Sequence, residues 1–206
     1  MSAHLAIAPL LAPFLAGLAL LALPRMPFAL QRAVTLAALL AQAGIALALL
    51  AAVAGGDILV YRLGGWPPPW GIVLVADRLA AVMVLTTTLL ALCAAIHAGD
   101  GADRHGRHFH VLFQLQLFGL AGAFLTGDLF NLFVFFEVLL IASYGLLLHG
   151  GGAARTRAGL HYVVLNLLGS AVFLFAAGLL YATLGTLNLA DLALKAAALP
   201  PQDAGL

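Results

Sequence analysis

The sequence is poor in charge. Asp, Glu, Lys and Arg together make up 8% of its 206 residues, against about 25% in an ordinary soluble domain. Hydrophobic residues make up 64%, and the formal net charge is only +1. The nine basic residues are scattered rather than clustered, so no positive patch is available to attract nucleic acid. These figures predict a chain that lies in a lipid bilayer and binds no nucleic acid.

The chain also has few of the residues from which enzyme and metal sites are built. Its single cysteine, Cys93, can form neither a disulfide nor a cysteine metal site within one chain. Four histidines border one predicted loop: His97, His105, His108 and His110. The last two point to different faces of a helix, which fits no helical metal pair, so we expect solvated interfacial histidines. We find no nucleophile and base pair and no phosphate-binding loop, and therefore predict a protein that is not an enzyme and holds no metal or cofactor.

Apolar runs fill most of the sequence. A transmembrane helix needs about twenty mostly apolar residues, and the runs that qualify are 5–23, 28–54, 79–97, 109–126, 129–148 and 159–184. They predict an all-α integral membrane protein of about six transmembrane helices, forming a single membrane domain over residues 1–206. The first run lacks a basic segment ahead of it and approaches a full span, so we interpret it as a mature helix rather than a secretory signal.

Two shorter segments lie outside the spans. The β-prone runs Ile58 to Leu63 and Gly71 to Val75 flank a stretch rich in Gly, Trp and Pro, which predicts a small hairpin between the second and third helices. A plain proline-rich loop is the alternative. The segment Asn188 to Ala198 is amphipathic, with its polar residues at spacings of three and four, and we expect it to lie along the membrane interface.

The basic residues predict an orientation. Six fall in loops on one side of the predicted spans: Arg25, Arg32, Arg104, Arg107, Arg155 and Arg157. Three fall on the other side: Arg62, Arg78 and Lys195. Because cytoplasmic loops carry the excess of Lys and Arg, we predict a multi-pass protein of the cell (inner) membrane with an extracytoplasmic amino terminus and hairpin.

Glu137 is the one acidic residue far from either end of a predicted span, about nine residues into a helix of about twenty. An ionised carboxylate at the bilayer centre costs about 2.5 to 3.5 kcal/mol on insertion scales, so such residues face a protein or water-filled interior and have a function. Desolvation raises a carboxylate's pKa and a nearby cation lowers it. Glu137 is therefore a candidate for loading and releasing a proton. The alternative is a permanently protonated side chain that hydrogen-bonds a neighbouring helix.

Partners for Glu137 must come from other helices, because no lysine lies inside a predicted span. Polar candidates on the fourth and sixth helices are Gln114, Gln116, His161, Asn166 and Ser170. His161 lies about one turn inside the sixth helix and could relay protons, since a histidine pKa is near neutrality; an interfacial histidine with satisfied hydrogen bonds is the alternative. Asp77 and Asp128 stand just before predicted helices and are expected to cap them.

The run LTGDLFNLFVFFEVLLIASY (Leu125 to Tyr144) resembles the D-type subunit of the Mrp-type monovalent cation/proton antiporters. Such proteins are relatives of the antiporter-like membrane subunits of respiratory complex I. The resemblance extends to three further segments: WPPPWGIVLVADRLAAVMVL (Trp66 to Leu85), HYVVLNLLGSAVFLF (His161 to Phe175) and LYATLGTLNLADLA (Leu180 to Ala193). Almost the whole chain thus aligns in order with the amino-terminal portion of that family.

The resemblance implies a membrane subunit of a Na⁺/H⁺ antiporter, without an organic cofactor, that assembles with other membrane subunits. It implies that Glu137 carries protons, paired with a lysine on a broken seventh helix. Members of this family have about fourteen helices in two inverted repeats, a pattern common in transporters, and the sequence stops before such a seventh helix. The alternatives are a subunit of a redox-driven proton pump, either complex I or a membrane hydrogenase, and a non-transporting assembly subunit or truncated fragment.

Overall fold

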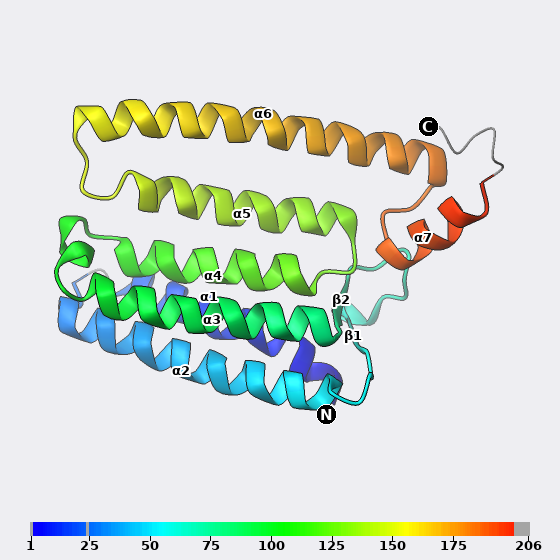
Figure 1. Ribbon diagram of the computed structural model, residues 1–206, viewed down its shortest axis with the longest axis horizontal. Helices are drawn as coiled ribbons and strands as arrows, with labels where there is room; N and C mark the ends of the chain where they lie inside the picture. The colour runs from blue at the N-terminus through cyan, green and yellow to red at the C-terminus, as the bar shows by residue number, and fades with distance from the viewer. Residues whose placement is uncertain (1, 24, 200–206) are drawn as a thin grey trace.

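The computed structural model describes residues 2–23 and 25–199. They form a bundle of long helices with a two-stranded sheet at one end (Figure 1). The elements in chain order are η1 (Ser2–Ala6), α1 (Ala8–Ala22), α2 (Phe28–Val53), β1 (Leu59–Arg62), η2 (Leu63–Gly65), β2 (Val73–Ala76), α3 (Arg78–Ala98), η3 (Ala102–His105), α4 (Phe109–Leu125), α5 (Leu129–Leu147), α6 (Ala153–Leu184) and α7 (Leu189–Ala197).

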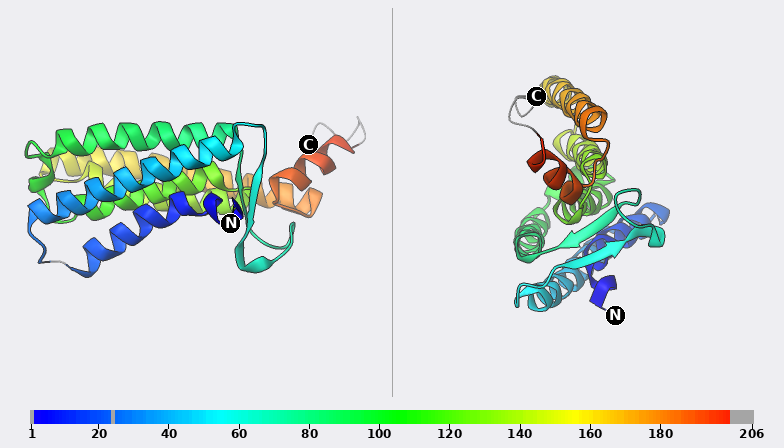
Figure 2. Two further views of the ribbon diagram at one scale, coloured as in Figure 1. Left: turned by 90° about the horizontal axis from the view of Figure 1, so that it is seen from below. Right: turned by 90° about the vertical axis from the view of Figure 1, so that its right-hand side faces the viewer.

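Helices α1 to α6 run side by side, and their connections alternate between the two ends of the bundle (Figures 1 and 2). Helix α1 packs on α2 and α4, α3 packs on α2, and α5 packs on α4, whereas α6 lies at the edge and packs mainly on α5. Glycine allows the closest of these approaches. A Cβ atom at Gly119 of α4 would lie 2.8 Å from the backbone nitrogen of Leu139 in α5, so the two helices could not approach so closely with any larger residue.

Helix α1 contains Pro13, which has no N–H to give to the carbonyl of Pro9 four residues earlier. The side chain of Gln42 in α2 donates to that carbonyl at 3.4 Å, and Gln42 is buried. The amide of Gln42 therefore gives a hydrogen-bond donor to the carbonyl that Pro13 leaves without its usual helical partner.

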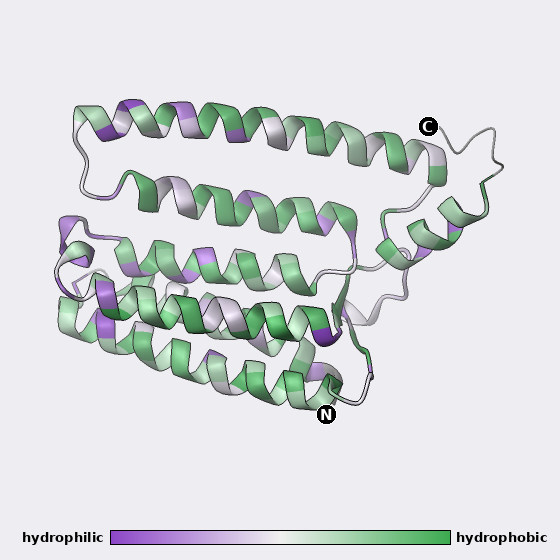
Figure 3. Ribbon diagram, in the orientation of Figure 1, coloured by the Kyte–Doolittle hydropathy of each residue, from purple (hydrophilic) through white to green (hydrophobic). Residues whose placement is uncertain are grey.

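Four helices are long and apolar enough to cross a membrane: α2, α3, α5 and α6. Helices α1 and α4 are also apolar but shorter, at 15 and 17 residues. Figure 3 shows hydrophobic residues along the lengths of the helices, with hydrophilic ones concentrated at the turns. The chain is thus a mostly helical, multi-pass membrane protein, while the count of six transmembrane helices stays a prediction.

Helix α6 differs from its predicted range of 159–184, because it begins at Ala153 and is 32 residues long. Residues 153–158 are alanine, arginine and threonine. The predicted start was set by hydropathy, which places charged arginines outside a membrane span. Arginine and alanine are nevertheless good helix formers, so the helix extends beyond the apolar run.

The predicted hairpin is present. Strands β1 and β2 pair antiparallel with Leu59 opposite Ala76, and β2 docks on the turn between α4 and α5, where the N–H of Gly127 donates to the carbonyl of Val73 at 2.9 Å. A Cβ atom at Gly127 would lie 2.7 Å from the side chain of Val75, which explains a glycine in this turn. The side of the membrane on which the hairpin lies remains a prediction.

Helix α7 follows directly after the link from α6. The side chain of Asn188 accepts a hydrogen bond from the N–H of Asp191 at 3.2 Å and so caps the helix, and Lys195 pairs with Asp191 at 3.2 Å. Asn188 also forms a bridge to Asp128 in the α4–α5 turn. The predicted amphipathic segment is therefore a helix next to the hairpin; its place at a membrane interface stays a prediction.

The bundle has two distinct ends (Figure 1). The hairpin end holds the β-hairpin, the α4–α5 turn and α7, and the η3 end holds the α1–α2 turn, η3 and residues 148–152. The six basic residues that the loop count assigns to one side of the membrane lie at the η3 end, and the other three lie at the hairpin end. Folding therefore separates the basic residues as the loop count predicts.

Candidate functional site

Glu137 is the ninth of the 19 residues of α5, near the middle of the helix, and is partly buried. Asp128 stands just before the first residue of this helix, and its side chain accepts a hydrogen bond from the N–H of Asn131 at 2.8 Å, which confirms the predicted cap. The carboxylate faces α6, where the hydroxyl of Ser170 donates to Oε1 of Glu137. A carboxylate with a hydroxyl donor thus lies halfway along the bundle.

The surroundings of this pair are apolar. Phe173 of α6 stacks on Phe133 and meets Phe136 edge-on, with ring centroids 6.1 and 6.0 Å apart. Between α5 and α6 lies an open groove of about 360 Å³, and its lining is Phe133, Phe136, Leu139, Leu140, Leu165, Asn166, Gly169, Ser170 and Phe173. In such a setting a carboxylate has little polar compensation for its charge. The arrangement suits a group that exchanges a proton.

Of the five polar candidates, only Ser170 has a hydrogen bond to Glu137 in the structure. The amide of Asn166 donates to the carbonyl of Tyr162 on its own helix at 2.8 Å. Nδ1 of His161 lies 2.8 Å from the carbonyl of Arg157, also on its own helix, and His161 is exposed. Within residues 2–23 and 25–199, no ion pair involves Glu137.

The two glutamines of α4 lie elsewhere. Gln114 is fully buried on the side of α4 that faces α1, where its Cβ lies 3.3 Å from the position that a Cβ on Gly17 would take. Both polar side-chain atoms of Gln114, and Oε1 of Gln116, have no hydrogen-bond partner in the described part of the chain. The structure does not bring either glutamine to Glu137.

A second polar cluster, at the η3 end, was not predicted. Asp103 of η3 accepts from Nε and Nη2 of Arg32 in α2 at 2.5 and 2.7 Å, and its side chain is 0% exposed. Nε2 of His110 in α4 lies 3.2 Å from the same carboxylate, and Nδ1 lies 3.0 Å from the hydroxyl of Thr35. The expectation that all four loop histidines are solvated is therefore wrong for His110, which is 2% exposed.

The chemistry of this cluster follows from its donors and acceptors. The guanidinium of Arg32, hydrogen-bonded to Asp103, holds the pKa of that carboxyl below its usual range. Since an ionised carboxylate only accepts, Nε2 of His110 carries a hydrogen and donates to it. The cluster ties η3 to α2 and α4. The sequence offers one signal for this cluster: Asp103 lies in a short loop, and two predicted spans contain Arg32 and His110 at that end of the bundle.

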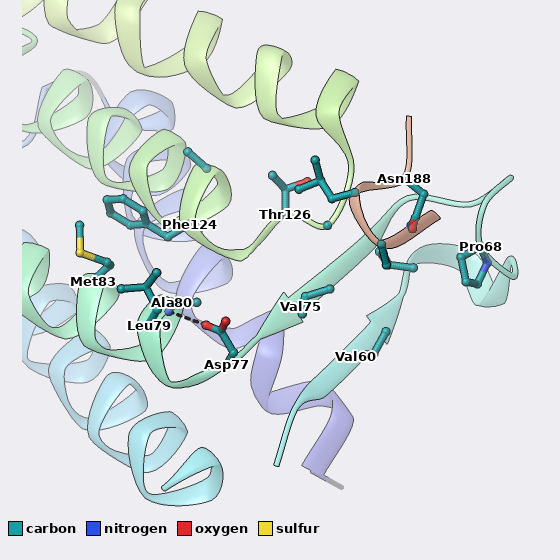
Figure 4. Close-up of a pocket in the computed structure, with 15 residues that line it drawn as sticks. Val60, Pro68, Val75, Asp77, Leu79, Ala80, Met83, Phe124, Thr126 and Asn188 are labelled. Carbon is teal, nitrogen blue, oxygen red and sulfur yellow. Dashed lines mark hydrogen bonds between the residues drawn. The ribbon is translucent and has the colours of Figure 1, made fainter. Parts of the chain in front are cut away.

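The hairpin end contains a larger hollow, of about 780 Å³, between the hairpin, the start of α3, the end of α4 and the start of α7 (Figure 4). Asp77 lines it, but its Oδ1 accepts from the N–H of Ala80 at 2.8 Å, so the residue caps α3 as predicted. Most of the other lining residues are apolar. In the described residues, no group of three or more His, Cys, Asp or Glu side chains could hold a metal ion.

Comparison with known proteins identifies relatives along almost the whole chain. Residues 126–203 match the family described as NADH:quinone oxidoreductase/Mrp antiporter, TM. The D-type subunit of a probable K⁺/H⁺ antiporter of Rhizobium meliloti is 50% identical over 204 residues, which is 97% of this chain and 38% of the relative. The D-type subunit of a Na⁺/H⁺ antiporter of Bacillus subtilis is 47% identical over 140 residues, which is 67% of this chain and 28% of the relative.

Solved structures agree in fold. The Mrp complex from Dietzia sp. DQ12-45-1b contains a chain that matches with a TM-score of 0.84 at 31% identity, over 95% of this chain and 39% of that one. A chain of the membrane-bound sulfane sulfur reductase, an archaeal respiratory membrane complex, matches with a TM-score of 0.86 at 31% identity, over 93% of this chain and 39% of that one. The chain spans less than two fifths of the length of the two curated relatives. On this evidence residues 126–203 belong to the NADH:quinone oxidoreductase/Mrp antiporter transmembrane family, and almost the whole chain is similar to part of the D-type subunits of the cation/proton antiporters.

Proposed function

We propose that this chain serves as a membrane subunit of a monovalent cation/proton antiporter, in which Glu137 loads and releases the transported proton. The observation that carries the proposal is the position of Glu137. It is a carboxylate halfway along a membrane helix, with one hydroxyl donor from Ser170 and aromatic residues on the neighbouring turns. A charged carboxylate at that depth costs about 2.5 to 3.5 kcal/mol on insertion scales, so its presence in a membrane helix points to a function.

The relatives support the choice of transport chemistry. Two curated relatives with identities of 47% and 50% are named as D-type subunits of Na⁺/H⁺ and K⁺/H⁺ antiporters. Because their names differ in the cation, we assign a monovalent cation, with Na⁺ as the first to test. The partners would be other membrane subunits, as in the Mrp complex that supplies a structural match.

The proposed topology has six spans, formed by α1 to α6, with the η3 end in the cytoplasm of a cell whose inner membrane holds the protein. Helices α1 and α4 run alongside the four longer apolar helices (Figure 1), which favours membrane insertion of all six. Six basic residues at the η3 end against three at the hairpin end favour this orientation. The amino terminus and the hairpin would then be extracytoplasmic.

The test is Glu137→Gln in the complete antiporter assembly, reconstituted in vesicles that contain a pH-sensitive dye. Glutamine is nearly isosteric and still accepts a hydrogen bond from Ser170, but it cannot ionise. We expect cation-driven proton movement to fall to the background level of protein-free vesicles. A matched control is Asp57→Asn, the same chemical change at an exposed residue between α2 and β1, which should leave the rate within twofold of the unmodified assembly.

Full exchange activity of the Glu137→Gln assembly, with the variant present in stoichiometric amount, would refute the proposal. The same outcome would favour an assembly role, in which the chain contributes packing surfaces but no proton site.

A redox-driven proton pump is the second candidate, and the structural match to an archaeal respiratory membrane complex favours it. The genes beside this one would distinguish the two. A set of small antiporter subunits supports exchange, whereas genes for iron–sulfur and nickel or flavin proteins support a pump coupled to electron transfer.

A further inference from the structure

Polar side chains form a line along the interface of α5 and α6. On α6, Tyr162, Asn166 and Ser170 stand at intervals of four residues and so lie close to one face of the helix. Asn166 and Ser170 line the groove of about 360 Å³ described above. The amide of Asn166 donates to the carbonyl of Tyr162, and Ser170 donates to Glu137. The line leads from Glu137 toward the η3 end of the bundle.

Tyr144 lies at the far end of this line, on α5. It comes seven residues after Glu137, so it shares that residue's face of the helix about 10 Å further along. Its ring meets the ring of Tyr162 edge-on, with centroids 5.7 Å apart. Helical side chains lean toward the amino terminus of their helix, which here is the direction of Glu137.

The hydroxyl of Tyr144 is buried, and no described residue is a hydrogen-bond partner for it. A buried polar group without a partner costs about 1–3 kcal/mol. Phenylalanine would fill the same space and keep the edge-on contact with Tyr162 without that cost. Packing alone therefore does not account for a tyrosine at this position.

A groove lies next to Tyr144 and Glu137, although neither residue is part of its lining. Its walls begin one turn from Tyr144, at Leu140, and extend past the level of Glu137 to Phe133. The groove of about 360 Å³ is large enough to admit water, and Asn166 and Ser170 are the polar side chains in its lining. The distance of about 10 Å along the helix corresponds to three or four links of about 2.8 Å each.

We infer that Tyr144 is a proton-carrying residue on an access route that joins the η3 end to Glu137, through waters held against Asn166 and Ser170 in the α5–α6 groove. This inference rests on the proposed function of Glu137. In each transfer one O–H bond breaks and another forms. Tyr144 passes its own hydroxyl proton onward as it receives one, so the phenol is unchanged and the added proton ends on a carboxylate oxygen of Glu137.

The experiment is Tyr144→Phe in the complete assembly, in the same vesicles and with rates normalised to the amount of assembled complex. We expect the initial exchange rate to fall at least fivefold, with a larger deficit at high pH, where proton supply limits the rate, and a larger solvent deuterium effect. The matched control is Tyr181→Phe on α6, whose side chain is exposed and which should behave as the unmodified assembly. A second variant, Asn166→Leu, should show the same pH-dependent deficit.

The outcomes separate the two claims. Normal rates for Tyr144→Phe at every pH, with Glu137→Gln inactive, overturn the access route and leave the proposed function intact. A deficit that is the same fraction at every pH, without a change in the deuterium effect, indicates a packing role and also overturns the route. Full activity of Glu137→Gln overturns both.

Discussion

The ion pair between Arg32 and Asp103 gives the sharpest prediction for stability. Asp103→Asn keeps the shape of the side chain but removes the charge that receives two hydrogen bonds from Arg32, at 2.5 and 2.7 Å. Removing one partner of a buried ion pair costs about 3–5 kcal/mol. Asparagine keeps one acceptor, and Arg32 is 25% exposed and can regain water. We therefore expect the free energy of unfolding to fall by about 2–3 kcal/mol, or roughly a hundredfold in the ratio of folded to unfolded protein.

The measurement is unfolding of the detergent-purified protein by a denaturing detergent, followed by circular dichroism. Asp100→Asn is the matched control, because Asp100 is in the same connection and undergoes the same chemical change, but its side chain is exposed. It should change the free energy of unfolding by less than about 0.5 kcal/mol. Equal effects of the two variants would refute the reasoning, since the charge of the loop rather than the buried pair would then be responsible.

The same pair predicts the dependence on pH. Its partner Arg32 holds the pKa of Asp103 below the ordinary value, which is about 3.9 in an unfolded chain. A carboxyl whose folded pKa is depressed contributes stability above the unfolded pKa and loses it as the pH falls through the folded pKa. The difference between the unmodified protein and Asp103→Asn should therefore be constant above about pH 5 and shrink below about pH 4. A difference that grows on acidification would contradict this assignment.

Three further substitutions can be tested by the same unfolding measurement. Gly119→Ala should destabilise by about 1–3 kcal/mol, because its Cβ would lie 2.8 Å from the backbone nitrogen of Leu139; no loss would mean that α4 and α5 separate easily. Gly44→Ala, at a helical position where a Cβ meets nothing within 4 Å, should instead stabilise by about 0.5–1 kcal/mol, and a loss there would argue against open space. Asp128→Ala should cost about 1 kcal/mol, because the N–H of Asn131 loses its acceptor; an unchanged free energy would show that the cap adds nothing.

Much of the fold could be predicted because its signals are local. The long apolar runs, the β-prone segments around the Pro-rich tip and the caps Asp77 and Asp128 each depend on a few neighbouring residues. The start of α6 was placed too late because hydropathy reports where lipid contact ends, whereas the helix continues through residues 153–158, which favour helix without being apolar.

The partners of the polar residues could not be predicted in the same way. Arg32 and Asp103 are 71 residues apart in the sequence, and His110 joins them only because α4 packs beside α2 at the η3 end. Similarly, five candidates were available for Glu137, and the pairing of α5 with α6 selects Ser170, while Gln114 faces α1.

The sequence by itself therefore determined that the chain lies in a membrane, where its helices run and that one carboxylate stands in the middle of a span. These features follow from hydropathy, helix propensity and the cost of a charge in lipid, which depend on single residues and their neighbours. Only the tertiary structure decided which polar groups meet, that Asp103 and His110 are buried together, and that the hydroxyl of Tyr144 has no partner among the described residues and lies near the groove lined by Asn166 and Ser170. Contacts between helices depend on which faces pack together. In a chain this apolar nearly every helix face is hydrophobic, so the sequence does not identify the face that packs.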